Sequence, residues 1–412
     1  MNNTLCKNKN NFLNLISILC ACIVPLLVTG PFLPDLLISI LSLWFLYYTF
    51  SKKYFFIYKN IFFYFFLSFC LVCILSSLLS DHILVSLKSS IFYFRIGIFA
   101  LLISYLINKN KKIIHYFYFS FIITFSLLII DGYFQYFTGY NLIGFEANTD
   151  RISSFFGDEL ILGSYLSRLT PLFLALFIVK PNKQFWEYIF IPTLILMIAL
   201  LILMSGERAS LLFFIIFLAF ITFFLSNYKF TKICIILGFF IVSFIFINNN
   251  SVYKKRFIDN TLESIGVNSS EKFIFSPQHD PLIKVGWKMF LEKPILGHGP
   301  KLFRIKCLNE KYSSSKINCH PHPHNFYIQL LAETGLIGFS FLLGLLIYFI
   351  YLVFNHILYY FKYKLTILSN YQICLLAGLL ITIWPITTNG DMFTNKLMMF
   401  YGLQVGFFRK EI

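Results

Sequence analysis

Three histidines and a long apolar run meet in the sequence CHPHPHNFYIQLLAETG, Cys319–Gly335, which continues as LIGFSFLLGLLIYFIYLVF, Leu336–Phe354. The second part is about as long as the 20 or so apolar residues that a helix needs to cross a bilayer. Imidazoles titrate near neutral pH and are costly to place in lipid. The junction therefore predicts a membrane protein that carries out chemistry at one water interface.

The composition supports this class. Of 412 residues, 58% are hydrophobic and only 13% are charged, whereas a soluble protein carries about 25% charged residues. Apolar runs recur along the whole chain, which indicates spanning helices rather than a β-barrel. The formal net charge is +16, but the lysines lie in short segments between apolar runs, so we expect no nucleic-acid partner.

The apolar runs predict an all-α polytopic membrane protein with about twelve spans. A cytoplasmic N-terminus places most lysines and arginines on the inner side, as the positive-inside rule requires. The short outer loops then hold only Lys88, Arg151, Arg208 and Lys396. The expected spans are 12–32, 33–50, 61–80, 91–107, 113–133, 161–179, 187–204, 208–226, 233–248, 335–356, 372–388 and 395–408.

Three regions follow from these spans. Residues 1–248 hold nine transmembrane helices, 249–334 form one large outer loop, and 335–412 hold the last three helices. The loop is expected to be mostly helical, with one amphipathic helix over Pro281–Lys293 that ends at Pro294. That helix lies on the membrane surface, covers a cavity as a lid, or packs inside the loop.

Two cysteines, Cys307 and Cys319, belong to the outer loop and lie twelve positions apart. In an oxidising compartment a disulfide between them is the favoured interpretation. It would anchor the chain that enters His320. The alternative is a pair of buried, unpaired thiols.

The histidines have two interpretations. Pro321 and Pro323 favour extended backbone, in which alternate side chains point the same way, so His320, His322 and His324 could bind zinc together. The favoured alternative is one catalytic histidine, His324, with the other two as polar neighbours and no metal.

A polar stripe follows the histidines. Asn325, Gln329 and Glu333 recur at every fourth position of the expected helix and so share one face. This face is either the wall of an active site or a solvated surface next to the membrane. Gly335 and Gly338 would allow close helix contact where the chain enters the membrane.

A second polar motif is the turn SGERAS, Ser205–Ser210, on the same outer side. Arg208 lies at a helix N-terminus, where its charge adds to the positive end of the helix dipole. The turn is therefore a candidate site for phosphate or pyrophosphate, with Glu207 orienting the arginine. The alternative is an arginine that extends to lipid head groups.

Further charged residues lie within or beside the spans. Burying a charge in the membrane is costly, so we expect each of them to be functional or paired with an opposite charge. They are Arg95, Asp131 and Arg168. Asp158 and Glu159 are candidate partners for Arg151 and Arg168.

Three segments together resemble the O-antigen ligase and polymerase superfamily. They are GERASLL, from Gly206; WKMFLEKPILGHGPKLF, Trp287–Phe303; and HPHNFYIQLLAETGLIG, from His322. The resemblance covers roughly residues 130–400. It implies a GT-C-like membrane glycosyltransferase of the bacterial inner membrane, metal-independent and inverting, with cytoplasmic termini and its active site in the periplasmic loop.

The resemblance also implies the substrates and the residue roles. The donor would be a glycan on undecaprenyl pyrophosphate, the acceptor lipid A–core or a growing glycan, and no cofactor is expected. Arg208 would hold the pyrophosphate and His324 would act on the acceptor hydroxyl. Many relatives have a phosphate-binding arginine shortly before the loop tryptophan, where this chain has Lys284. A lysine can still bind the pyrophosphate as a point charge but loses the paired hydrogen bonds of an arginine, which Arg256 or Arg304 would compensate.

Two other functions fit the sequence. A polymerase would use the same donor and the same residues, and differ only in its acceptor. A glycolipid flippase or exporter would do no chemistry, but transporters concentrate charges near the bilayer midplane. Here the polar residues gather at one outer face, which favours an enzyme.

Overall fold

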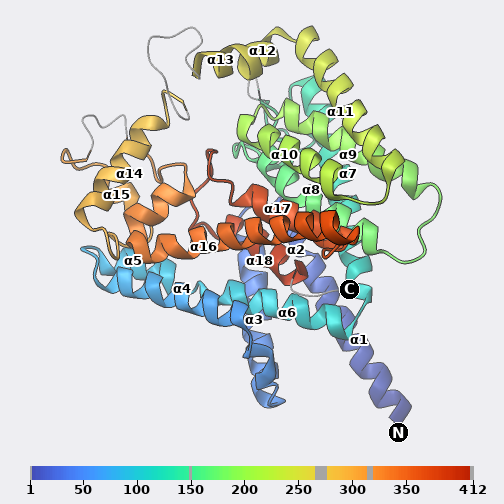
Figure 1. Ribbon diagram of the computed structural model, residues 1–412, viewed down its shortest axis with the longest axis horizontal. Coiled ribbons are helices and arrows are strands. Elements are labelled where there is room, and N and C mark those ends of the chain that lie inside the picture. Colours follow the sequence, from blue (N-terminus) through green and yellow to red (C-terminus); the bar gives the residue numbers. More distant parts are fainter. Residues whose placement is uncertain (1, 148–150, 265–275, 313–318, 409–412) are drawn as a thin grey trace.

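The computed structural model describes residues 2–147, 151–264, 276–312 and 319–408. Every regular element in these ranges is a helix (Figure 1). The outer loop predicted over 249–334 is described except for 265–275 and 313–318.

The first part of the chain, up to residue 249, contributes most of the helical bundle. Its elements are α1 (Asn2–Ala21), α2 (Ile23–Leu26), α3 (Phe32–Ser51), η1 (Phe55–Tyr58), α4 (Ile61–Leu78), α5 (Ile83–Ser90), α6 (Phe94–Lys109), α7 (Lys112–Thr138), η2 (Ser154–Phe156), α8 (Leu162–Val179), α9 (Glu187–Met204), α10 (Arg208–Phe224) and α11 (Lys229–Asn249).

The rest of the chain begins with short helices and returns to the bundle. Its elements are α12 (Ser251–Lys254), η3 (Lys255–Asp259), α13 (Asn260–Ser264), α14 (Asp280–Glu292), α15 (Phe303–Lys306), α16 (Phe326–Tyr363), α17 (Asn370–Thr382) and α18 (Asn395–Phe408). In Figure 1, α12 and α13 lie at the edge of the bundle above α10 and α11, and α14 and α15 lie beside the start of α16.

Eight helices of the described chain are long and apolar enough to cross a membrane, and three shorter helices are also apolar. The eight include Ile83–Lys109, where α5 and α6 follow each other almost without a break. The all-helical membrane class is therefore confirmed. The count of twelve spans and the orientation of the termini stay predictions.

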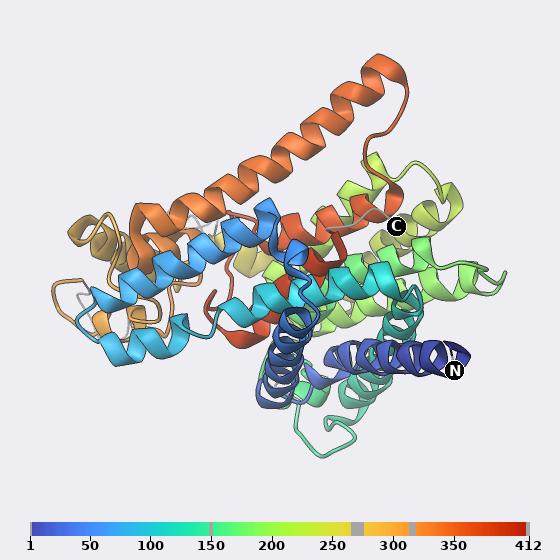
Figure 2. The same cartoon turned by 90° about the horizontal axis from the view of Figure 1, so that it is seen from below.

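Helix α8 occupies the centre of the bundle and packs against α7, α9, α10 and α17. Its side chains are buried almost throughout, Arg168 among them. Helices at the periphery differ. Beyond Gly338, α16 exposes large apolar side chains such as Phe354 and Phe361, and it runs out past the other helices in Figure 2. Lipid would cover such a surface, which is too apolar for water.

Helix α16 is kinked at Gly335, whose φ of 64° and ψ of −166° are not helical. The loop after α14 is bonded to this kink: His298 N–H donates to Ala332 O, Gly299 N–H to Glu333 O and Leu336 N–H to Pro294 O, at 2.8 to 3.0 Å. The loop thus satisfies backbone groups that the kink would otherwise leave unpaired. It also fixes α14 to the membrane helix.

Helix α14 ends one residue before the predicted end at Lys293 and begins at Asp280, with Pro281 at its first turn, where proline is tolerated. Its buried residues Leu282, Val285 and Met289 form a small core with Phe303 and Tyr312. The helix packs on α16. Its inner face is therefore covered by protein, which favours the packed interpretation of this helix.

Candidate functional site

The three histidines lie together at the N-terminus of α16. Their ring centroids are 4.0 Å apart for His322 and His324, and 4.3 Å apart for His320 and His324. Nε2 of His324 and Nδ1 of His320 are 3.0 Å apart. His324 has a φ of +57°, a left-handed conformation that is uncommon outside glycine. Surrounding contacts must therefore hold this residue in place.

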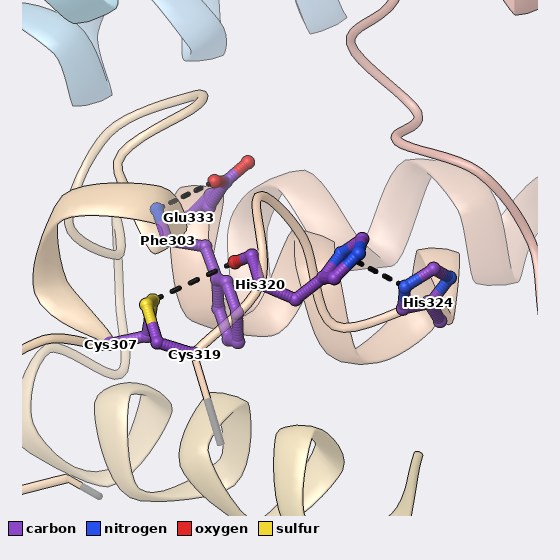
Figure 3. The surroundings of a disulfide bond; sticks show 6 residues. All are labelled: Phe303, Cys307, Cys319, His320, His324 and Glu333. Carbon is purple, nitrogen blue, oxygen red and sulfur yellow. Dashed lines mark hydrogen bonds between the residues drawn. A yellow bond between two sulfur atoms is a disulfide. The ribbon is translucent and has the colours of Figure 1, made fainter. Parts of the chain in front are cut away.

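A disulfide anchors the chain just before the histidines (Figure 3). It joins Cys307 to Cys319, with 5.2 Å between the Cα atoms. Cys307 follows α15 directly, and the carbonyl of His320 lies 3.6 Å from its sulfur. The bond therefore ties the histidine segment to α15.

The polar stripe of α16 is buried rather than solvated. Asn325 caps the helix by accepting bonds from Tyr327 N–H and Ile328 N–H. Gln329 donates to an oxygen of Glu333 at 3.1 Å and to Asp391 at 2.6 Å. Glu333 accepts 2.9 Å from Phe303 N–H. These contacts join α16 to the segment before α18 and to α15, so the stripe holds the helix that carries His324.

The arginine of α15 lies within electrostatic reach of the histidines. Arg304 forms a 3.0 Å ion pair with Asp391, and its charge acts on His322. Lys284 is exposed on α14. Arg304 is thus in electrostatic contact with the histidine cluster.

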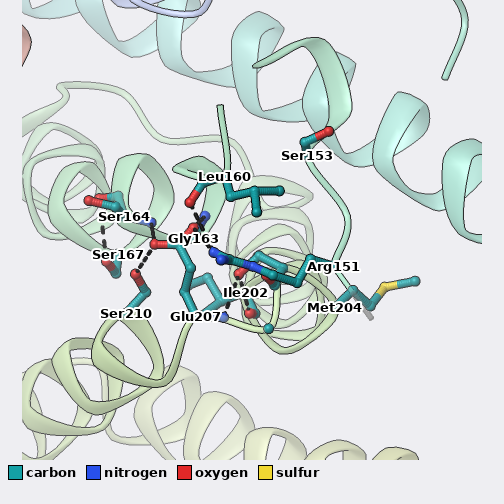
Figure 4. Close-up of polar contacts among 12 residues, drawn as sticks. Arg151, Ser153, Leu160, Gly163, Ser164, Ser167, Ile202, Met204, Glu207 and Ser210 are labelled. Atoms are coloured by element: carbon teal, nitrogen blue, oxygen red, sulfur yellow. Dashed lines mark hydrogen bonds and ion pairs between the residues drawn. The ribbon is translucent and has the colours of Figure 1, made fainter. Parts of the chain in front are cut away.

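Glu207 binds the N-terminus of α8 and not Arg208 (Figure 4). Its carboxylate accepts hydrogen bonds from Gly163 N–H at 2.8 Å and Ser164 N–H at 3.1 Å, and another from Ser210 Oγ. Arg151 lies 4.0 Å away. The expectation that Glu207 orients Arg208 is therefore wrong, because the open N–H groups of a neighbouring helix bind the carboxylate instead.

The predicted partners of two arginines are also different in the structure. Glu159 pairs with Lys396 at 2.9 Å, and Arg151 bonds to Ser205 O and Leu160 O. Arg95 pairs with Asp35 at 2.5 Å, and Asp131 accepts from Leu142 N–H and Ser154 Oγ. The half-buried Arg95 and the buried Asp131 thus have structural partners.

Arg208 is half-buried at the start of α10. It donates weakly to Asn260 O at 3.3 Å and Ser264 Oγ at 3.4 Å, across to α13. Arg256 of η3 donates 2.6 Å to Gly206 O, in the same turn. The two guanidinium groups are close enough for their charges to act on each other. Two cations and a helix N-terminus therefore meet at this turn, which is the composition of an anion site.

His279 connects the arginine turn with the histidine cluster. Its ring lies 4.8 Å from that of His324, and the charge of Arg208 acts on it. Its Nδ1 is hydrogen-bonded to Ser276 Oγ at 2.6 Å. His279 was not among the site residues predicted from the sequence. Its signal was a histidine in the outer loop just before Asp280–Pro281, where α14 begins.

A second connection runs through the centre of the bundle. Arg168 of α8 donates 2.8 Å to Asn389 Oδ1, and the N–H of Asn389 donates 2.6 Å to His324 O. The guanidinium also lies 4.6 Å from the ring centroid of Phe213. Arg168 is 2% exposed. A buried arginine thus supports the backbone of His324 through one asparagine.

Burial, followed by the neighbouring His322, His279 and His320, lowers the pKa of His324 to about 2. Burial also lowers the pKa of His322 to about 4, while Asp391 opposes the shift. The pKa of His279 is lowered by burial and by Arg208. The imidazoles are therefore neutral at neutral pH and can accept a proton or bind through nitrogen.

A cavity of about 660 Å³ lies elsewhere, between α2, α7 and the segment that contains η2. Its lining is mostly apolar, with Asp158 and Glu159 as its acidic members. Carboxylates repel a pyrophosphate, so this cavity does not compete with the arginine turn as an anion site.

Residues 192–343 match a family model described as O-antigen ligase. The match contains Arg208, Arg256, Lys284, Arg304 and His324. No curated protein matches the chain.

Proposed function

We propose that the chain, whose residues 192–343 match the O-antigen ligase family, is an inner-membrane glycosyltransferase that transfers a glycan from undecaprenyl pyrophosphate to lipid A–core. Family members are glycosyltransferase-like enzymes. In the proposed orientation both termini are cytoplasmic and the loop 249–334 is periplasmic, which follows the distribution of lysines and arginines between the short loops.

One observation carries the proposal. His279 is linked to both Arg208 and His324, which are over a hundred residues apart. The charge of Arg208 acts on His279, and the ring centroids of His279 and His324 are 4.8 Å apart. A glycosyl transfer needs a cationic site for the leaving group and a proton acceptor for the incoming hydroxyl. This arrangement offers both at one place.

Arg208 and Arg256 are the proposed pyrophosphate ligands. Their guanidinium groups, together with the N-terminus of α10, would take up the negative charge that develops as the glycosidic C1–O bond to phosphate breaks. Such a cation cluster can replace a metal ion in this role, so the proposed transfer is metal-independent. Arg304 would contribute less, because Asp391 already neutralises part of its charge.

His324 is the proposed partner of the acceptor hydroxyl. As the acceptor oxygen forms its bond to C1, the hydroxyl proton passes to an imidazole nitrogen, and undecaprenyl pyrophosphate leaves from the opposite face with inversion. A histidine of very low pKa is a weak base. Binding of an anionic donor raises that pKa, because the negative charge favours the protonated ring. The site would then gain basicity only when the donor is present.

Reconstitution in proteoliposomes tests the function. The full chain is given undecaprenyl-pyrophosphate glycan and lipid A–core with EDTA present, and the products are separated by size and lipid. Glycan on lipid A–core would support a metal-independent ligase. Longer glycans that remain on undecaprenyl pyrophosphate would make the protein a polymerase. Transport of the donor without transfer to either acceptor would overturn the proposal in favour of a flippase.

A further inference from the structure

The His-Pro-His-Pro-His segment forms the one group of three or more metal-binding side chains found in the described part of the chain. The nitrogen atoms of His320, His322 and His324 all lie within 4.8 Å of one another. Tetrahedral zinc has bonds of about 2.0–2.1 Å to histidine, so its nitrogen ligands lie about 3.3 Å apart. His320 is exposed, and a turn of its ring is a small change at the surface.

The segment is held at both ends. Cys319, immediately before it, is bonded to Cys307. At the other end the carbonyl of His324 accepts from Asn389 N–H at 2.6 Å, and Asn325 caps α16. The prolines restrict the backbone in between. Little conformational entropy would therefore be lost when the three rings bind an ion.

The three imidazoles are the nitrogen ligands that this segment offers. Both sulfurs nearby are in the disulfide and are not ligands.

The surrounding charges set the strength of binding. The negative charge of Asp391 favours a cation near His322, whereas the positive charge of Arg304 disfavours it. The charge of Arg208 likewise disfavours a cation near His279. The balance favours a site that added metal fills reversibly over one that holds an ion permanently.

We propose that His320, His322 and His324 form a transition-metal site that binds Zn²⁺ through three imidazole nitrogens, and that the bound ion inhibits glycosyl transfer. Imidazole suits zinc, copper and nickel, and three protein ligands leave one position open. The ion would occupy the nitrogen with which His324 meets the acceptor hydroxyl. The inhibitory half of this inference rests on the proposed function, and the binding half does not.

The test begins with binding. The full chain, purified without a histidine tag and stripped with EDTA, is placed in nanodiscs and titrated with ZnCl₂ by calorimetry. We expect one ion per chain, with affinity weakened by roughly tenfold or more in His320→Gln and in His322→Gln. His82→Gln and His115→Gln are the matched controls, because they remove histidines outside the cluster. Titration with Co²⁺ adds an optical band that reports tetrahedral nitrogen ligation.

The second step measures transfer at increasing Zn²⁺, each variant being compared with its own metal-free rate. Half-inhibition should require roughly tenfold more zinc in His320→Gln than in the wild type. Equal zinc affinity in all variants would overturn the site. Zinc that binds as expected but leaves the rate unchanged, or raises it, would overturn the inhibition. A chain that binds zinc but shows no transfer under any condition would contradict the proposed function and leave the metal site standing.

Discussion

The main-chain N–H of Asn389 donates a 2.6 Å hydrogen bond to the carbonyl oxygen of His324. The side chain of the same asparagine accepts a 2.8 Å bond from Arg168, which is buried in the central helix α8. Because His324 has a left-handed backbone, its position depends on such contacts. The histidine at the surface is therefore positioned from the core of the bundle.

Asn389→Ala should lower kcat of the transfer by roughly 10- to 100-fold, because small displacements of a reacting group are costly. Asn389→Asp keeps an acceptor oxygen for Arg168 and should retain most of the rate. Asn395→Ala, at an exposed position in the same region, is the control. Measurement of kcat and of thermal stability separates the roles. A variant that is less stable but has a normal kcat would show that Asn389 only stabilises the fold.

Gly335→Ala should destabilise the protein by more than roughly 2 kcal/mol, since the left-handed backbone alone costs about 1–3 kcal/mol for other residues. A Cβ at this position would also lie 2.3 Å from Ile295 O, where the loop docks on the kink. Gly344→Ala on the same helix is the matched control, because no atom lies within 4 Å of its added Cβ.

The measurement is the thermal unfolding of both glycine variants in nanodiscs. Equal melting temperatures would contradict the docking of the loop on α16.

Loss of the Cys307–Cys319 disulfide should loosen the histidine segment. Closing a loop of this length stabilises the folded state by about 3 kcal/mol in the chain-entropy model. Cys307→Ser/Cys319→Ser should therefore exchange amide hydrogens faster around His320 and lose transfer activity. Cys234→Ser, which changes a cysteine without a disulfide, is the control. Unchanged exchange and activity in the double variant would show that the bond is dispensable.

The pH dependence follows from the lowered pKa values. His324 and His322 are neutral in the free enzyme down to about pH 4, so kcat/KM should change by less than about twofold between about pH 5.5 and 8. A change in kcat/KM of the wild type near pH 6.5 that is absent from His324→Asn would contradict the buried, neutral cluster.

The stability of the fold, unlike kcat/KM, should depend on pH in this range. Both histidines have folded-state pKa values below the ordinary 6.5, so below that pH the unfolded chain binds more protons than the folded chain. The free energy of unfolding should therefore fall as the pH is lowered through 6.5 and below. Thermal melts across this range measure the slope.

Parts of the fold and of the candidate site could be predicted from the sequence because their sequence patterns are local. Apolar runs predict the helical membrane class, and Pro281 with Pro294 marks the limits of α14 to within a residue. The motifs around Arg208 and His324 stand out because polar residues interrupt apolar sequence. The sequence alone could not assign Glu207 to α8, since its partner Gly163 is 44 residues away.

The contacts that hold His324 in place could not be predicted from the sequence either. Arg168 and Asn389 are separated by 221 residues and meet only because α8 and α17 pack together. No periodic pattern encodes such a contact. The buried polar stripe of α16 shows the same limit: the spacing of Gln329 and Glu333 predicts a shared face, but not that Asp391 and Phe303 cover it.

In the proposed function, Arg208 holds the donor and His324 acts on the acceptor within one site. The most direct measurement is donor binding and single-turnover transfer, side by side, in EDTA-treated proteoliposomes. The variants are Arg208→Met, Arg208→Lys and His324→Asn, since asparagine tolerates the left-handed backbone of residue 324. Lys284→Met, at an exposed lysine, is the matched charge control.

Arg208→Met should weaken donor binding and slow transfer by roughly 10²–10³-fold, with partial recovery in Arg208→Lys. His324→Asn should bind the donor normally and slow transfer by roughly 10²–10⁴-fold, and Lys284→Met should behave as the wild type. Normal transfer by His324→Asn, or normal donor binding and transfer by Arg208→Met, would contradict the account.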